Sequence, residues 1–223
     1  LFEFLNHHGM LELGNSPIWK TVVGGSNTYV EAILALIPNK RMERVTSVKR
    51  FADYVEVNGE RFDYAIIATH ANAALEILVD ADPEERKNLA AITYSQNKTV
   101  LHKDSSVLPK ATKARASWNY QMESCKEASN KVLVSYWMNL LMSLKTSKDY
   151  VVTLNGDVAP EKIIATMNYE HPVFTVAAIN AAEFLRNAGG ERLAFAGAHL
   201  GWGFHEDGAR SGVNAARKFG AKW

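Results

Sequence analysis

The chain of 223 residues carries 25 basic and 24 acidic side chains, a formal net charge of +1, and 47% of its residues are hydrophobic. This charge balance excludes a surface field that attracts nucleic acid or an anionic membrane, and no apolar run approaches the roughly 20 residues that span a bilayer. The single cysteine, Cys125, excludes an internal disulfide framework; its polar surroundings predict an exposed loop with a free thiol.

The first third of the chain predicts one helix and several strands. Residues 19–38 predict a strand end, a tight turn and a helix that the closing proline stops. Residues 43–69 are strand-like throughout, and Asn58-Gly59 is a strong signal for a two-residue hairpin. The last part, YAIIAT at 64–69, lacks polar alternation, which predicts a strand buried on both faces.

The middle of the chain changes from mixed to mostly strand character. A helix is expected from about 71 to 79, and a second one starts at Asp82, with Pro83 at its first position and Glu85 at its third. Residues 94–154 then alternate strands with polar turns. Strands of this kind inside an α/β frame predict a separate, mostly antiparallel sheet.

The end of the chain holds its most informative stretch, FAGAHLGWGFHEDGARSG at 195–212, after a predicted helix (177–190) and strand (192–197). Five of its eighteen residues are glycine, which destabilises helix and strand interiors alike, so a loop is expected. A helix should follow from about 206–208, with Asp207 capping its start and Gly220 ending it. This turn is either an anion- or carbonyl-binding site or a tight packing loop.

Other polar residues leave alternatives open. His199, His205, Glu206 and Asp207 lie within nine positions, but three successive residues of a loop cannot all turn to one ion without strain, so we expect no metal site. The Gly-Gly-Ser run at 24–26 is either a phosphate-binding turn or a plain tight turn. His70 either faces a ligand at the carboxyl end of its strand or caps a helix at the surface. The aromatic residues of 118–120 and 136–137 belong to the core or wall a substrate site.

The glycine-rich stretch closely resembles the C-terminal flavin-binding signature of the FAD-dependent amine oxidoreductase family. The match lies with the branch whose bacterial members carry a Gly-Phe-His-Glu-Asp-Gly motif, here at 203–208. Further segments follow the order and approximate spacing of that family: 19–30, 62–78, 97–109, 116–120, 136–141, 152–155 and 169–174.

The resemblance implies an α/β fold, the C-terminal part of a doubly wound FAD-binding domain with an interleaved, mostly antiparallel substrate-domain sheet. Residues 1–18 would end a substrate-domain segment, 19–80 and 176–223 would belong to the FAD-binding domain, and 81–175 would form the substrate sheet. The G-x-G-x-x-G fingerprint that opens such proteins does not occur here. A fragment, a separate upstream polypeptide and a reduced relative each explain its absence, and the sequence does not choose among them.

The resemblance also implies a function, flavin-mediated hydride transfer, with FAD bound if the upstream half is present. It carries over no catalytic residue. The branch is often associated with cyclopropane-fatty-acid synthases, which favours a lipid or fatty-acyl substrate, or another small molecule. The rival hypothesis is a non-catalytic structural subunit of a larger assembly. The sequence predicts no cellular compartment. The cofactor-binding residues implied by the resemblance are Gly197, Gly203, Phe204, Glu206, Asp207, Gly208, Ser211 and, through its backbone at the adenine edge, Val45.

Overall fold

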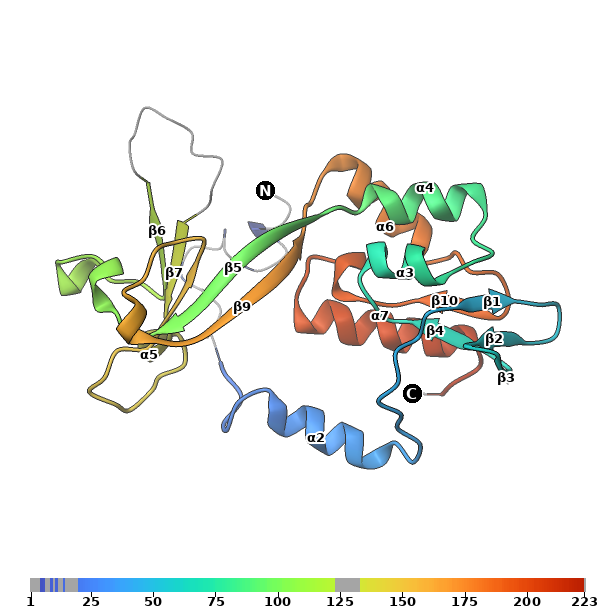
Figure 1. Ribbon diagram of the computed structural model, residues 1–223, viewed down its shortest axis with the longest axis horizontal. Helices are drawn as coiled ribbons and strands as arrows, with labels where there is room; N and C mark the ends of the chain where they lie inside the picture. Colours follow the sequence, from blue (N-terminus) through green and yellow to red (C-terminus); the bar gives the residue numbers. More distant parts are fainter. Residues whose placement is uncertain are drawn as a thin grey trace. The chain divides into compact units, whose positions relative to one another are not determined.

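The computed structural model describes residues 5, 6, 9, 11, 14, 20–122 and 133–222 (Figure 1). The predicted loop around Cys125 and most of the predicted segment 1–18 lie outside the described residues. The chain divides into two compact units, one formed by Leu1–His8, Pro38–Ser95 and Pro172–Trp223, the other by Gly9–Ile37 and Gln96–His171. In the described part, no helix has the length and apolar character needed to cross a membrane.

The first unit contains a small antiparallel sheet that the sequence predicted in detail. Strands β1 (Val48–Arg50), β2 (Val55–Val57) and β3 (Glu60–Phe62) pair in that order. The turn between β2 and β3 has positive φ at both central residues, 48° for Asn58 and 85° for Gly59. A type I′ turn requires this pair of conformations, so the predicted hairpin is confirmed.

A parallel pair of strands forms the centre of the first unit. Strand β10 (Leu193–Phe195) pairs with β4 (Ala65–Ile67). Leu193 and Phe195 pack into the larger core cluster, whereas Ala194 packs on the opposite side with Ala215. The helices of this unit are α3 (Ala71–Ile77), α4 (Pro83–Ala91), α6 (Val176–Leu185) and α7 (His205–Lys218) (Figure 1).

The expectation that residues 64–69 are buried on both faces is wrong for β4. Ile67 is buried, but the side chain of Ile66, which faces the other way, is 41% exposed. The strand that fits the expectation is β10, all of whose residues are buried, because helices pack against both of its faces. Apolar composition alone therefore did not identify the more deeply buried strand.

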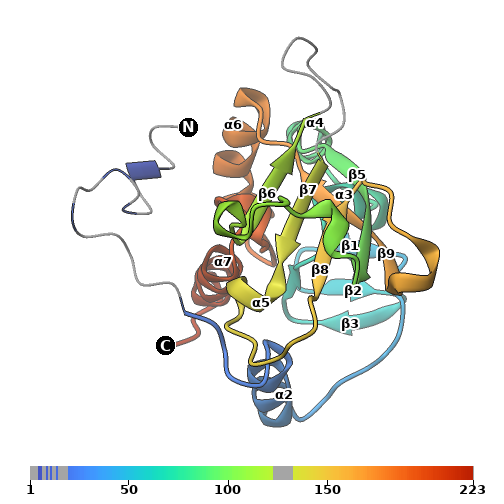
Figure 2. The ribbon, with the colours of Figure 1, turned by 90° about the vertical axis from the view of Figure 1, so that its left-hand side faces the viewer.

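The second unit contains the predicted separate sheet. Its five strands lie in the order β6-β7-β8-β5-β9, and the β5–β8, β6–β7 and β7–β8 pairs are antiparallel (Figure 2). Neither β4 nor β10 belongs to it, so the prediction of a distinct sheet is confirmed. Its elements are β5 (Tyr94–His102), β6 (Trp118–Gln121), β7 (Leu133–Trp137), β8 (Val151–Leu154) and β9 (Ile163–Pro172), with helices α2 (Asn27–Leu36) and α5 (Met138–Leu141) and 3₁₀ turns η1 (Ser105–Val107), η2 (Thr112–Ala114) and η3 (Pro160–Lys162).

A chain of polar side chains is buried in this sheet. The Nδ1 atom of His102 accepts a hydrogen bond from the backbone N–H of Asp104 at 3.0 Å, so its Nε2 atom carries the proton. Nε2 therefore donates to the Thr153 hydroxyl at 2.8 Å, which lies 2.9 Å from the Ser135 hydroxyl. Burial lowers the pKa of His102. Because these groups are buried and pair with one another, they stabilise the sheet rather than offering a reactive hydroxyl.

The compact units divide at different residues from the predicted domains. The boundaries lie at 95/96 and 171/172 rather than at 80/81 and 175/176, and residues 9–37 group with the second unit. The reason for the first shift is that Leu89 and Ile92, at the end of α4, bury their side chains in the core of the first unit. The assignment of the two units to cofactor and substrate binding stays a prediction.

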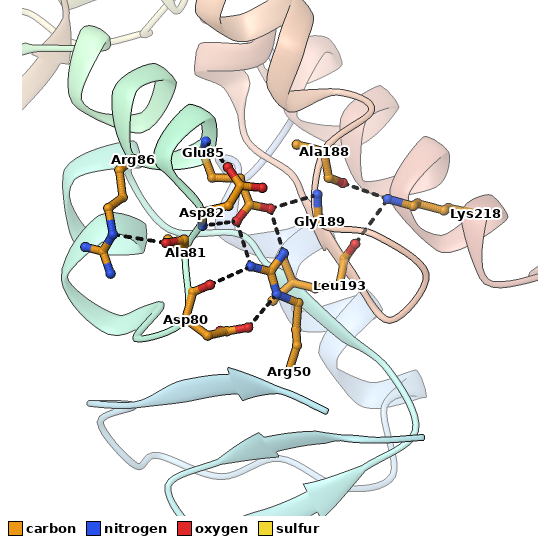
Figure 3. A network of polar contacts seen from close by, with 10 residues as sticks. All are labelled: Arg50, Asp80, Ala81, Asp82, Glu85, Arg86, Ala188, Gly189, Leu193 and Lys218. Atoms are coloured by element: carbon orange, nitrogen blue, oxygen red, sulfur yellow. Dashed lines mark hydrogen bonds and ion pairs between the residues drawn. The ribbon is translucent and has the colours of Figure 1, made fainter. Parts of the chain in front are cut away.

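A buried ion-pair network ties three segments of the first unit together (Figure 3). The guanidinium of Arg50 on β1 donates to Asp80 at 2.9 Å and to both carboxylate oxygens of Glu85 at 2.6 and 2.7 Å. Glu85 also accepts the N–H groups of Asp82 and Gly189, at 3.1 and 3.2 Å. Asp82 in turn accepts the Glu85 N–H at 2.8 Å, so the predicted start of α4 is confirmed as a capping box.

We expect Arg50→Met to lower the free energy of unfolding by about 3–5 kcal/mol, because it leaves a buried carboxylate without its cation. The side chain of Glu85 is only 3% exposed. The matched control is Arg41→Met, which removes an ion pair with Glu60 whose partners are 62% and 49% exposed. Denaturant titration should show a large shift for the first variant and almost none for the second. Equal midpoints for both would contradict a central role for the network.

Candidate functional site

The glycine-rich stretch forms a turn between β10 and α7. After the strand come a short 3₁₀ turn, η4 (Ala198–Leu200), and a loop at 201–204, and α7 begins at His205. The predicted order of strand, loop and helix is confirmed, with the helix starting one residue before the predicted range. The Ser211 hydroxyl accepts the Gly197 N–H at 2.8 Å and donates to the Gly208 carbonyl at 2.7 Å, so it fastens the turn to the helix.

Asp207 holds the start of α7, but not from the position predicted. The residue at the helix cap is Phe204, and the Asp207 carboxylate reaches back from the first turn to accept the Phe204 N–H at 3.1 Å. Its other oxygen lies where Gly201 leaves room: a Cβ built on Gly201 would be 2.5 Å from Asp207 Oδ1. The carboxylate therefore faces inward, and the absence of a side chain at 201 makes that possible.

The end of α7 is also fixed. Gly220 has a φ of +84°, its N–H bonds to the Arg217 carbonyl at 3.0 Å, and the Ala221 N–H bonds to the Ala216 carbonyl at 3.2 Å. These two bonds form a Schellman motif, as predicted for Gly220. The Lys218 ammonium donates to the carbonyls of Ala188 and Leu193, at 2.7 and 3.2 Å, and ties the helix end to the turn before β10 (Figure 3).

His199 is a neutral imidazole beside this turn. Burial, with a smaller contribution from the charge of His70, lowers the pKa of His199 to about 4. Its ring fills the space beside Gly197, where a Cβ would lie 2.4 Å from the His199 Cε1 atom. Among the described residues, none hydrogen-bonds the ring. A cavity of about 260 Å³ adjoins it, lined by Ile92, Pro172, Val173, Phe174, Ala178, Ile179, Ala182, Arg186, His199, Gly201 and Trp202.

The predicted cofactor residues differ in exposure. Gly203, Phe204 and Glu206 are exposed at the rim of the turn, Gly197, Gly208 and Ser211 are half-buried within it, and Asp207 is buried. The turn thus brings seven of the eight together. Val45 lies on another segment, ahead of β1, and packs against the larger core cluster.

The structure places the remaining candidate residues as follows. Gly24 and Gly25 form a turn ahead of α2, with the Gly25 N–H bonded to the Val22 carbonyl, and they belong to the second unit. His70 occupies the cap position of α3 without a side-chain capping bond, and its ring stacks on that of Tyr94 with centroids 4.5 Å apart. In the part of the chain that the structure describes, no three His, Cys, Asp or Glu side chains are grouped so as to hold a metal ion.

Sequence reasoning missed Arg186 at the end of α6. Its guanidinium donates from Nε and Nη2 to the Leu200 carbonyl, at 2.9 and 2.6 Å, and so fixes the 3₁₀ turn against the helix. An arginine after an apolar helix gives no signal of this role, since the carbonyl that it binds lies fourteen residues further on.

Comparisons with known proteins support the fold. No family model and no curated protein matches the chain. Among solved structures, it is similar to a CLA-producing fatty acid isomerase from P. acnes, with a TM-score of 0.61 and 15% identity over 88% of this chain and 52% of that one. It is also similar to a double mutant of putrescine oxidase redesigned at its cofactor binding, with a TM-score of 0.58 and 12% identity over 89% of this chain and 54% of that one.

The chain therefore spans about half the length of these structures. At such low identity the similarity establishes the fold alone. The predicted fold class is confirmed: a mixed α/β structure with separate sheets, consistent with the C-terminal part of a flavin amine oxidase fold.

We expect Gly201→Ala to destabilise the turn, because its methyl group would displace the Asp207 carboxylate from the Phe204 N–H. The loss should be about 1–3 kcal/mol, the cost of leaving a buried charged acceptor without its bond. Gly212→Ala is the control, since a Cβ there meets nothing within 4 Å and alanine favours a helix interior by up to about 1 kcal/mol. Denaturant titration should move the two midpoints in opposite directions; a shift of the same sign would contradict the role of Asp207.

We further expect the folded state to lose stability as the pH falls from about 7 toward 4. Below the pH at which a free histidine titrates, the unfolded chain binds a proton that the folded His199, with a pKa of about 4, does not. The loss is about 3 kcal/mol for this residue. His199→Gln should flatten the pH dependence of thermal unfolding in this range, and an unchanged slope would contradict the assignment.

Proposed function

We propose that the chain is the C-terminal portion of an FAD-dependent oxidoreductase, in which the turn at 197–208 lies against the flavin. The observation that carries the proposal is the exposed rim of this turn at Gly203–Glu206, set at the start of a fourteen-residue helix in a fold shared with an enzyme redesigned at its cofactor binding. The sequence resemblance indicates FAD as the cofactor.

The residues of the turn fit a flavin ring. The buried Asp207 carboxylate is turned inward, so its charge is engaged by the Phe204 N–H and does not face outward. The first turn of α7 then presents its backbone N–H groups at the positive end of the helix dipole. Such an end stabilises negative charge on the pyrimidine side of a flavin when that ring is reduced.

When bound, FAD would supply the ring that accepts a hydride. In this proposal the backbone at 203–206 orients the pyrimidine end, and Phe204, whose side chain is 40% exposed, covers one side of the ring and excludes water. Ser211 is a positioning residue, because both of its hydrogen bonds hold Gly197 and Gly208 in place. Val45 would contact the adenine through its backbone alone.

The substrate proposed is a lipid or fatty-acyl chain. Support comes from the cavity beside His199, whose walls are mostly apolar, and from the fold shared with a fatty acid isomerase. A neutral imidazole there can accept or donate a hydrogen bond but brings no charge, which suits an uncharged part of an apolar substrate. A small amine is the alternative substrate, since the putrescine oxidase shares the same fold.

The proposal is tested with the polypeptide purified as its source organism makes it, by the flavin absorbance per protein. Gly208→Glu should reduce flavin occupancy several-fold, about 1 kcal/mol, because it adds a carboxylate where the dipole would hold the ring. A Cβ at Gly208 lies 3.8 Å from the nearest atom, so the first atom of the new side chain makes only an ordinary contact.

Gly212→Glu is the matched control, with the same charge one turn further along α7. Its occupancy should stay near that of the unaltered protein, because the dipole effect fades within the first turn. Equal flavin content in all three proteins would refute the placement of the cofactor. A natural polypeptide free of flavin would instead favour a structural subunit.

A further inference from the structure

The side chain of Asn58, at the turn between β2 and β3, makes contacts that the turn itself does not require. A type I′ turn can have asparagine, aspartate or glycine at this position, because each of them tolerates a positive φ. Of the three, only asparagine carries both a hydrogen-bond donor and an acceptor in its side chain. Both are used here, and both bind one segment, residues 44–47 ahead of β1.

The amide of Asn58 pairs with this segment as a neighbouring strand would. Its Oδ1 atom accepts the N–H groups of Thr46 and Ser47, at 2.9 and 3.2 Å, and its Nδ2 atom donates to the Arg44 carbonyl at 2.9 Å. The backbone N–H of Asn58 donates to the Ser47 carbonyl at 3.0 Å. The side chain thus extends the pairing of β1 with β2 beyond Val48, at the point where the chain turns away into β3.

Val45 lies between the backbone groups that Asn58 holds. The N–H and C=O of one trans peptide unit point in opposite directions. Because the Arg44 carbonyl and the Thr46 N–H both point to Asn58, the N–H and the C=O of Val45, which belong to the same two peptide units, point away from it. Neither group bonds to any described residue, whereas the Val45 side chain packs against the larger core cluster. Val45 therefore presents one donor and one acceptor from an anchored position.

A donor and an acceptor on one residue match the edge of adenine, which carries an amino donor beside a ring-nitrogen acceptor. The proposed function places the adenine of FAD at the Val45 backbone, and the inference drawn here rests on it. The segment 44–47 belongs to no helix or strand, so side chains that bind it have to supply its rigidity. A segment that is already ordered binds a ligand more tightly, because binding then costs less conformational entropy.

We propose that Asn58 is a positioning residue for the adenine: it holds the groups on either side of Val45 and so keeps the Val45 backbone oriented toward the cofactor. Asn58 itself does not touch the cofactor. Without its side chain, the segment 44–47 loses the side-chain hydrogen bonds that fix it, and FAD would have to order the segment on binding. The contacts of the glycine turn with the flavin would be unaffected.

Asn58→Gly is the test, because glycine keeps the positive φ of the turn and removes only the side-chain amide. The polypeptide as its source organism makes it is freed of flavin and titrated with FAD, followed by flavin fluorescence. ADP, which carries the adenosine half alone, is measured as a competitor. Both dissociation constants should rise about tenfold. FMN, which lacks the adenosine half, should bind the variant and the unaltered protein equally.

Asn155→Gly is the matched control. Asn155 also precedes a glycine, has a φ of +59° and donates from its side chain, to Asn97 at 2.9 Å, but it belongs to the second unit. This variant should leave the binding of all three ligands unchanged.

An unchanged FAD constant in Asn58→Gly, an equal loss of FMN affinity, or a comparable loss in Asn155→Gly would each overturn the role of Asn58. Tight FAD binding by the unaltered protein would leave the proposed function standing in all three cases. An unaltered polypeptide that binds neither FAD nor ADP would overturn both proposals.

Discussion

The contact on which the first unit depends is the bidentate ion pair of Arg50 with Glu85. A carboxylate this deeply buried is costly to desolvate, and only its cation and the two N–H groups that it accepts make the arrangement stable. These contacts join β1, the start of α4 and the turn at Gly189. Because that turn leads directly into β10, the ion pair also helps to fix the start of this strand.

Helix α7 extends that constraint to the glycine turn. At its end, Lys218 binds the carbonyls of Ala188 and Leu193, next to the residue that Glu85 holds. At its start, Asp207 and Ser211 bind backbone N–H groups of the turn itself. Side chains of α7 thus fix the start of β10 at one end of the helix and the glycine turn at the other. The exposed rim of the turn consists of Gly203, Phe204, His205 and Glu206, and this is the surface that we propose lies against the flavin.

Features set by neighbouring residues could be predicted from the sequence. The Asn58-Gly59 hairpin, the capping box at Asp82 and the Schellman motif at Gly220 all follow from the conformational preferences of a few adjacent residues. The order of strand, loop and helix at 195–212 belongs to the same class. Long-range contacts determine the rest. The neutral state of His199 depends on its burial and on His70, and the role of Arg186 depends on a carbonyl fourteen residues away.

Dependence on distant residues also explains why the predicted cap role of Asp207 and the predicted burial of Ile66 were wrong. Aspartate is a favourable residue type for a helix cap, but the cap position of α7 is occupied by Phe204. The Asp207 carboxylate instead folds back from the first turn into the space that Gly201 leaves. Ile66 belongs to an apolar run, yet what covers a strand is decided by elements elsewhere in the chain. Gly197 and Ser211 belong at once to the edge of β10 and to the turn. The hydrogen bond between the Gly197 N–H and the Ser211 hydroxyl therefore fixes the strand end and the loop together.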